Sequence, residues 1–238
     1  MQYKYTVLTF IFNDYDILRE PKKVDPNAEY ICITDTERDS KIWNVVTDTT
    51  LVGQHPIYAS YYVRYHPFKY VHADTVIVMD ASIQINDNLD SVIDEFNESG
   101  ADLSVMLSNF VTDEAKIDYW LNIRQGITSA EADKLHSFIT TMKQQNIKGS
   151  PVITCALYRR STLVTAFLNT VWNYLIDYGI DGVPNRLDEV VLHKALMRHG
   201  TELSIFPVSP QLIQSTYMTY CEHNSDIPVK PYLNFDQF

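Results

Sequence analysis

Apolar runs alternate with amphipathic stretches along this chain, and the alternation predicts a β-sheet with helices on its faces. Residues Val76 to Met79 form an unbroken apolar run, which is typical of a strand covered on both sides in a largely parallel sheet. Two similar runs, at residues 5–12 (YTVLTFIF) and 28–35 (AEYICITD), predict two more buried strands. Residues 42–48 predict a third, shorter strand between them and the central run.

Helices are predicted between these strands. Residues 56–71 (PIYASYYVRYHPFKYV) predict a helix that begins at Pro56 and ends near Pro67, because proline fits the first turn of a helix but not its interior. Other amphipathic stretches predict helices at 87–100, within 113–145, at 163–179 and at 186–200. Strands are predicted at 101–109, 150–161 and 202–210, and the tail that follows has no clear periodicity.

The order of these elements predicts the fold class. The chain has 238 residues, enough to bury one sizeable core, and no repeat, low-complexity tract or linker interrupts the pattern. We therefore expect a single α/β domain over residues 1–238, with a mostly parallel central sheet flanked by helices.

Charge and hydropathy exclude several partners. The formal net charge is −11 and no dense run of Lys or Arg occurs, so nucleic acid is not the expected partner. The apolar start lacks a positively charged region before it and is followed by Asp14 and Asp16, which favours a strand over a signal peptide. No apolar stretch approaches the ~18 residues of a transmembrane helix, although peripheral membrane contact stays open.

The cysteines indicate a reducing compartment. The chain has three of them, widely separated and without a CxxC pair. This pattern argues against a disulfide framework and against a cysteine zinc site. We therefore expect a cytoplasmic protein.

Acidic residues stand at the ends of three predicted strands. Asp14 follows the first, Asp35 the second and Asp80 the central run. If these strands are neighbours in one parallel sheet, the three carboxylates gather along the edge where α/β proteins bind ligands. Each of them also has a simpler interpretation as a turn or cap residue. No strand is followed by GxGxxG or GxxxxGK[ST], so a bound phosphate would require side-chain cations or a metal.

Several of these motifs together resemble a known family. The sequence is similar to a glycosyltransferase-like family of bacteria and plants, long catalogued as a domain of unknown function and related to the GT-A nucleotide-diphosphate-sugar transferases. The resemblance is most specific over residues 5–86 and rests on "YTVLTFIFNDYDILREP", "AEYICITD", "YYVRYHPFKY" and "VIVMDASIQI". It returns in "ALYRRS" and in "RLDEVVLHKAL", where the family usually shows Arg-Asp-Gln.

The resemblance implies a donor site at Asp80. In GT-A enzymes an Asp-x-Asp motif at the end of a central strand holds Mn²⁺ or Mg²⁺, which meets the charge of the departing diphosphate. Asp80 matches the first carboxylate, but Ser82 replaces the second. Three arrangements would compensate for the missing second carboxylate. A residue from elsewhere in the chain, such as His223, would bind the metal, the metal would be held mainly by the diphosphate, or basic side chains would take the place of the metal.

Further donor contacts follow from the same resemblance. Arg64 stands where the family tends to have lysine, and would lie over the phosphates unless it is a surface residue. Asp14 and Asp35 correspond to positions near the base and the ribose. The resemblance thus implies a nucleotide-binding part at about 1–110 and an acceptor-side part at about 111–238.

Acceptor chemistry is expected near residue 188. Asp188 and Glu189 at a predicted helix start are the candidates for a general base or for contacts to sugar hydroxyls, with Arg186 nearby. The alternative is purely structural, since a helix N-terminus favours acidic residues electrostatically.

Three functions are compatible with these residues. The first is a glycosyltransferase that moves a sugar from a nucleotide-diphosphate sugar to a glycan or other hydroxyl acceptor, in surface polysaccharide or glycoconjugate synthesis. The second is a nucleotide-sugar-binding protein without activity, which the loss of the second carboxylate suggests. The third is a nucleotidyltransferase, but the glycine-free "IFNDYDILRE" argues against it.

Overall fold

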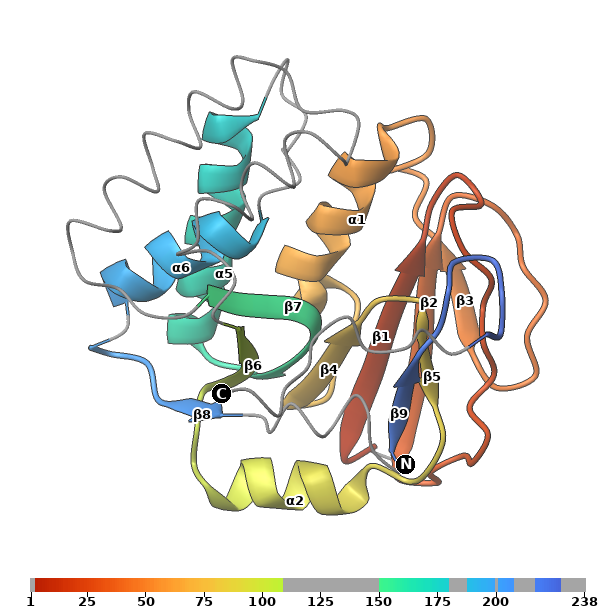
Figure 1. Cartoon of the computed structure of the whole chain (residues 1–238), viewed down its shortest axis with the longest axis horizontal. Coiled ribbons are helices and arrows are strands. Elements are labelled where there is room, and N and C mark those ends of the chain that lie inside the picture. Colours follow the sequence, from red (N-terminus) through yellow and green to blue (C-terminus); the bar gives the residue numbers. More distant parts are fainter. Residues whose placement is uncertain (1–2, 109–149, 180–187, 200, 208–216, 228–238) are drawn as a thin grey trace.

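A seven-stranded sheet forms the centre of the molecule (Figure 1). The computed structural model describes residues 3–108, 150–179, 188–199, 201–207 and 217–227. The strands in spatial order are β3 (Asn44–Thr47), β2 (Ala28–Thr34), β1 (Tyr5–Ile11), β4 (Thr75–Met79), β7 (Ser150–Arg159), β6 (Leu103–Ser108) and β8 (Ile205–Pro207).

The sheet is mostly parallel. Strands β3, β2, β1 and β4 pair in parallel, β7 is antiparallel to both β4 and β6, and β6 pairs in parallel with β8. All residues of β1 and β4 are buried, as expected for strands whose two faces are covered. The predicted α/β class with a mostly parallel sheet flanked by helices is confirmed.

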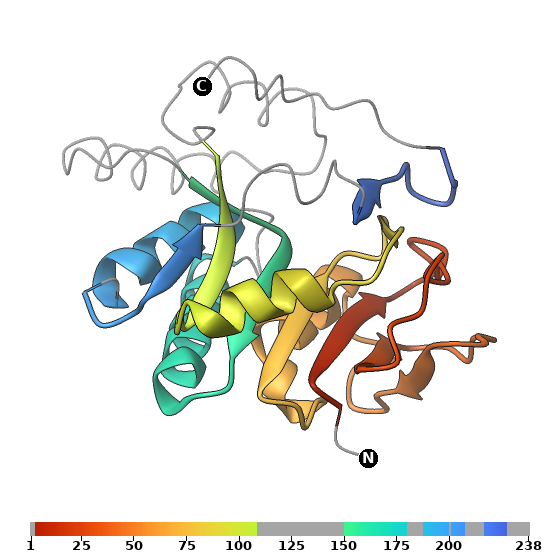
Figure 2. The ribbon, with the colours of Figure 1, turned by 90° about the horizontal axis from the view of Figure 1, so that it is seen from below.

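Two apolar cores lie on opposite faces of the sheet. Figures 1 and 2 show the helices that flank the sheet. Helices α1 (Pro56–Tyr65), α5 (Thr162–Tyr178) and α6 (Asp188–His199) cover one face. Helix α2 (Asp90–Glu98) contributes Ile93 and Phe96 to the core on the other face. Helix α1 is shorter than the stretch that predicted it, because after Tyr65 the chain continues as a separate 3₁₀ turn, η1 (Pro67–Lys69).

A small antiparallel ribbon was not predicted. Strand β5 (Ile83–Ile85), directly after the Asp80 turn, pairs with β9 (Met218–Tyr220) from the tail that lacks periodicity. Three residues are too few to show a strand pattern, so only the pairing reveals them. The ribbon brings residues 221–227 next to the end of β4, where Cys221 N donates to Ser82 O at 2.8 Å.

Two further predictions concern the region 113–145 and membrane-spanning helices. The predicted helical region 113–145 lies outside them. Within the part of the chain that the structure describes, no helix combines the length and apolar character required to cross a membrane.

Candidate functional site

The three predicted carboxylates follow neighbouring strands. Strand β1 lies between β2 and β4 and is parallel to both, so Asp14, Asp35 and Asp80 all stand beyond the carboxyl edge of the sheet. Asn13 and Asp14 have positive φ angles of 55° and 49°, and this left-handed turn redirects the chain as it leaves β1. We call the region formed by these strand ends the β1–β4 edge.

Asp80 forms an ion pair with Arg64 from helix α1. The arginine is 5% exposed and its guanidinium lies over the ring of Phe10 at 5.2 Å, so it is not a surface residue. Burial raises the pKa of Asp80 above its usual range, although the positive charge of Arg64 opposes this shift. The resemblance implied that Arg64 would lie over the phosphates; in the structure it holds the Asp80 carboxylate.

Asp16 is the central acid of the edge, and sequence reasoning did not identify it as a site residue. It is 3% exposed and accepts hydrogen bonds from Arg19 Nη1 at 2.8 Å, from Ile17 N at 2.8 Å and from Asn224 N at 3.2 Å. Its other oxygen lies 2.6 Å from His223 Nδ1. Burial alone would raise the pKa of Asp16, but these hydrogen bonds outweigh it and hold the pKa below its usual range.

His223 comes from the tail and lies between Asp16 and Tyr15. Its Nε2 is 3.2 Å from the Tyr15 hydroxyl, and the two rings are tilted with centroids 4.4 Å apart. The charges of both His223 and Asp16 act on the pKa of Asp80, which places the three groups within electrostatic reach of one another. The structure therefore brings His223 to the β1–β4 edge, in contact with Asp16.

Arg19 joins the separate segments of this edge. It is 5% exposed, and its guanidinium donates to Ala81 O at 2.6 Å, to Glu222 O at 2.8 Å and to Ser225 O. One side chain thus ties the loop after β1, the Asp80 turn and the tail together. The only sequence signal for Asp16 and Arg19 is their spacing of three residues in a loop, which does not distinguish a buried ion pair from a solvated one.

Asp14 and Asp35 differ in what they offer a ligand. The Asp14 carboxylate is 80% exposed and pairs with Arg38 at 2.6 Å. Asp35 accepts a hydrogen bond from Asn13 N at 2.9 Å, while its second oxygen is buried without a partner among the described residues. Asp35 thus combines a turn contact with a free acceptor, and Asp14 lies in solvent.

A metal site is only partly assembled among the described residues, where no group of three or more His, Cys, Asp or Glu side chains is arranged to hold an ion. Asp80 is paired with Arg64, and His223 is in contact through both ring nitrogens. Ser82 is 1% exposed, and its hydroxyl is buried without a hydrogen-bond partner in the described part of the chain. Asp80 and His223 are suitable ligand types, but a third ligand is missing from this set.

The acceptor-side residues are described only in part. Arg186 lies outside the described residues. Asp188 and Glu189 are the first two described residues of α6, and residues 180–187 before them lie outside the described part of the chain. Leu192 and Ala195 of the same helix are buried in the core, so the helix is anchored to the sheet.

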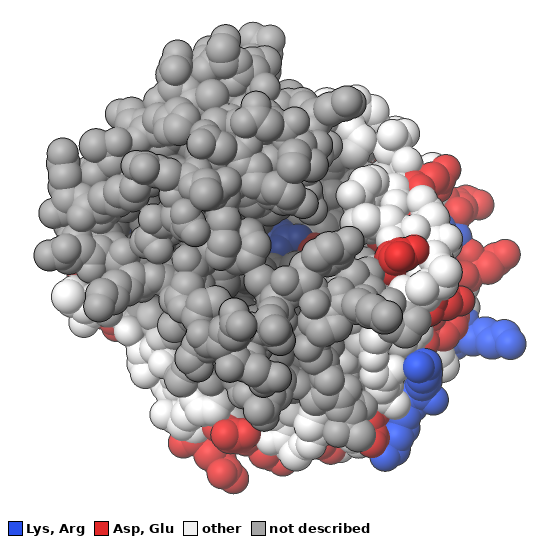
Figure 3. All heavy atoms as spheres, in the orientation of Figure 1, with Lys and Arg blue, Asp and Glu red and all other residues white. Residues whose placement is uncertain are grey.

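The space-filling view shows basic and acidic atoms next to each other near the middle of one face (Figure 3). Other acidic and basic groups gather at the rim of the same view. Described residues of both charges are thus visible on this face of the molecule.

Solved structures similar to this chain include a xylosyltransferase and a glycosyltransferase. Mouse xyloside xylosyltransferase 1 aligns with a TM-score of 0.47 at 11% identity, over 86% of this chain and 85% of that one. The glycosyltransferase GlyE of Streptococcus pneumoniae aligns with a TM-score of 0.45 at 9% identity, over 88% of this chain and 46% of GlyE. TarS of S. aureus (residues 1–349) aligns with a TM-score of 0.44 at 14% identity, over 90% of this chain and 59% of that one.

These similarities concern the overall fold. The chain spans less than two thirds of the length of GlyE and of TarS. No protein-family model matches the sequence, and no curated protein matches it significantly. The roles of individual residues therefore rest on the geometry described above.

The network around Asp16 predicts a specific loss of stability in acid. The pKa of Asp16 is lower in the folded protein than its unfolded value of about 3.9, so its stabilising contribution is full above that value and is lost as the pH falls through the folded pKa. Between about pH 5 and pH 2 the free energy of unfolding should therefore fall more in the wild type than in Asp16→Asn.

Urea unfolding at a series of pH values measures this difference. The matched control is Asp177→Asn on α5, which changes an exposed aspartate and should leave the pH slope unchanged. Parallel curves for the wild type and Asp16→Asn would show that Asp16 does not stabilise the folded state through its charge.

Proposed function

We propose that this protein is a glycosyltransferase that moves a sugar from a nucleotide-diphosphate sugar to a glycan or other hydroxyl acceptor, in surface polysaccharide or glycoconjugate synthesis. The observation that carries the proposal is the convergence of Asp80, Asp16 and His223 at the β1–β4 edge, with Arg64 buried against Asp80. Carboxyl edges of this kind are where open α/β sheets bind nucleotides.

The charges of the edge suit the chemistry of glycosyl transfer. Breaking the anomeric C–O bond develops positive charge on the sugar and negative charge on the departing diphosphate. Arg64 is a buried cation that stays protonated, so it can stabilise that diphosphate if the donor displaces or shares its Asp80 partner. Asp35, with its free buried oxygen, is the proposed acceptor of a hydrogen bond from the base or ribose.

A divalent metal is a further part of the proposal. His223 Nδ1 is held by the buried Asp16 carboxylate, and a carboxylate in this position commonly orients a metal-binding imidazole. Asp80 and His223 would then hold Mn²⁺ or Mg²⁺ together with diphosphate oxygens. When bound, the metal would supply positive charge to the leaving group.

A binding protein without transferase activity is the second candidate. It is favoured by the Ser82 hydroxyl, which stands where a second carboxylate is expected and is buried without a partner among the described residues. Such a protein would bind the nucleotide-diphosphate sugar at the same edge and neither transfer nor hydrolyse it.

Thermal shift with nucleotide-diphosphate sugars, with and without Mn²⁺, tests the proposed donor site. A ligand that binds only the folded state raises the melting temperature, by an amount that corresponds to about 2.7 kcal/mol at 100 times its dissociation constant. We expect a rise with at least one donor, and a clearly smaller rise with Asp80→Asn at the same donor concentration. The absence of a shift with every common donor would contradict both the transferase and the binding protein.

Position 82 gives a second prediction about the metal. A carboxylate introduced by Ser82→Asp would be buried without a described partner, so this variant should melt below the wild type in the absence of metal. If position 82 faces the metal, Mn²⁺ with a nucleoside diphosphate should restore the melting temperature of Ser82→Asp by more than it raises that of the wild type.

The control for this experiment is Ser82→Ala. It removes the unpartnered hydroxyl without adding charge, so its melting temperature should stay near that of the wild type. If Ser82→Asp gains no more from Mn²⁺ than Ser82→Ala does, residue 82 does not face the metal.

A further inference from the structure

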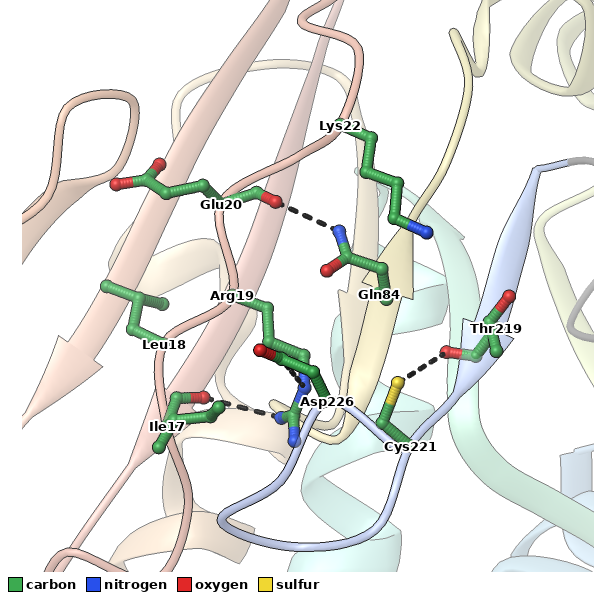
Figure 4. A pocket seen from close by; sticks show the side chains of 9 residues that line it. All are labelled: Ile17, Leu18, Arg19, Glu20, Lys22, Gln84, Thr219, Cys221 and Asp226. Carbon is green, nitrogen blue, oxygen red and sulfur yellow. Dashed lines mark hydrogen bonds and ion pairs between the residues drawn. The ribbon is translucent and has the colours of Figure 1, made fainter. Parts of the chain in front are cut away.

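A pocket of about 470 Å³ lies apart from the predicted donor residues (Figure 4). It is lined by Ile17, Leu18, Arg19, Glu20, Lys22, Gln84, Thr219, Cys221 and Asp226. Its size is in the range that encloses a small organic ligand. Neither Asp80 nor any other residue of the predicted donor site lines it.

The β5–β9 ribbon explains why the pocket is polar. Ile83, Ile85 and Met218 are buried in the core, and side chains alternate along a strand. Gln84 and Thr219, which pair with each other across the ribbon, therefore face away from the core. They line the pocket together with residues of segment 17–22. Gln84 Nε2 donates to Glu20 O at 2.9 Å, which fixes the segment above the ribbon.

Two cationic donors of the pocket have unused hydrogen-bonding capacity. The Lys22 ammonium has no hydrogen bond or ion pair with a described residue, whereas its neighbour Lys23 pairs with Asp87 at 2.6 Å. Arg19 Nε is buried without a hydrogen-bond partner among the described residues, and its ion pair with the exposed Asp226 carboxylate is long, at 3.7 Å. A buried donor left without a hydrogen bond destabilises the folded protein, and an acceptor in the pocket would offset that cost.

These donors favour an anionic ligand. The lining holds two acidic residues, Glu20 and Asp226, beside these two cations. The Glu20 carboxylate points away from Lys22 and Gln84 (Figure 4) and accepts hydrogen bonds from Ser40 Oγ at 2.9 Å and from Lys41 N at 2.8 Å, so it is turned out of the space that Lys22 faces. Asp226 also lines the pocket, but its side chain is 82% exposed and its repulsion is screened by solvent. Figure 4 shows the Lys22 and Gln84 side chains reaching into the same space, so hydroxyl groups of the ligand can be bound beside its anionic group.

We propose that this pocket binds a small hydroxylated anion, a sugar carboxylate or sugar phosphate, and that it forms the acceptor side of the site. The assignment to the acceptor rests on the proposed function, whereas the binding of the anion does not. Arg19 connects the two regions, since it lines the pocket and also donates to Ala81 O, one residue after Asp80, at 2.6 Å. An acceptor held here would border the β1–β4 edge.

Isothermal titration with glucuronate, glucose 6-phosphate and glucose tests the proposal. We expect at least one of the two anions to bind at least about tenfold more tightly than neutral glucose, because charge-assisted hydrogen bonds are about twice as strong as neutral ones. The stronger of the two anions identifies the ligand as a carboxylate or a phosphate. Equal binding of all three, or binding of none, would overturn the anionic assignment.

Two neighbouring lysines supply the variant and its control. Lys22→Gln should weaken the binding of the anion at least about tenfold, while Lys23→Gln, which changes a lysine outside the pocket, should leave it unchanged. Both lysines are exposed, so neither change should impair folding. An equal loss of anion affinity in both variants would show that the anion responds only to general surface charge. Unchanged affinity in both would show that the anion binds outside this pocket. Each of these outcomes contradicts the proposal.

Asp80→Asn separates this inference from the proposed function. It should weaken donor binding and leave anion binding intact, because Asp80 does not line the pocket. Anion binding without any donor binding in the wild type would refute the transferase and retain the pocket. Donor binding without anion binding would refute the pocket alone.

Discussion

Replacing Asp80 by asparagine is expected to weaken the binding of a nucleotide-diphosphate sugar about 10- to 100-fold, the effect of losing a contact to a charged group. Asp80 stands at the end of the buried strand β4 and forms an ion pair with Arg64, and the charges of Asp16 and His223 also act on it. The change removes the negative charge that pairs with Arg64. The side-chain carbonyl of asparagine, unlike alanine, still accepts a hydrogen bond from the buried Arg64, so Asp80→Asn should destabilise the fold less than Asp80→Ala.

Titration calorimetry measures this loss, and unfolding in urea checks the fold of the variant. Asp87→Asn is the matched control, since it neutralises another aspartate that is paired with a basic residue but lies away from the β1–β4 edge. Unchanged donor affinity in a folded Asp80→Asn variant would remove Asp80 from the donor site.

Replacing Asp188 by asparagine separates an enzyme from a binding protein. A transferase requires a group that positions or deprotonates the acceptor hydroxyl, and such a group contributes a factor of ~10² or more. Asp188 begins α6, which is anchored to the core through Leu192 and Ala195. We therefore expect Asp188→Asn to retain donor affinity and to lose at least about 100-fold in transfer or donor hydrolysis.

Turnover of the donor and its binding constant should be measured on the same preparation. Asp177→Asn, on the exposed side of α5, is the control for a change of charge on a helix. Full turnover in Asp188→Asn would assign Asp188 a structural role at the helix N-terminus. Loss of donor affinity together with turnover would place Asp188 in donor binding instead.

The sequence by itself determined the fold class and the edge at which ligands are expected. Runs such as Val76 to Met79 have no polar position, so only a strand covered on both faces accommodates them, and the structure has β4 there. Parallel neighbours end at the same edge, and for this reason Asp14, Asp35 and Asp80 could be grouped before their strands were seen together. The prolines at 56 and 67 likewise set the limits of the first helix and of the turn that follows it.

Only the tertiary structure decided which polar residues meet at that edge. Asp16 and Arg19 occur in a loop of mixed character, and their burial depends on a tail more than 200 residues away that supplies His223 and Asn224. Arg64 is one of several polar residues on its helix until the packing of α1 against β1 brings it to Asp80. Local periodicity reflects which face of an element is buried, whereas these contacts depend on which distant surfaces fold together, and no spacing within a single segment carries that information.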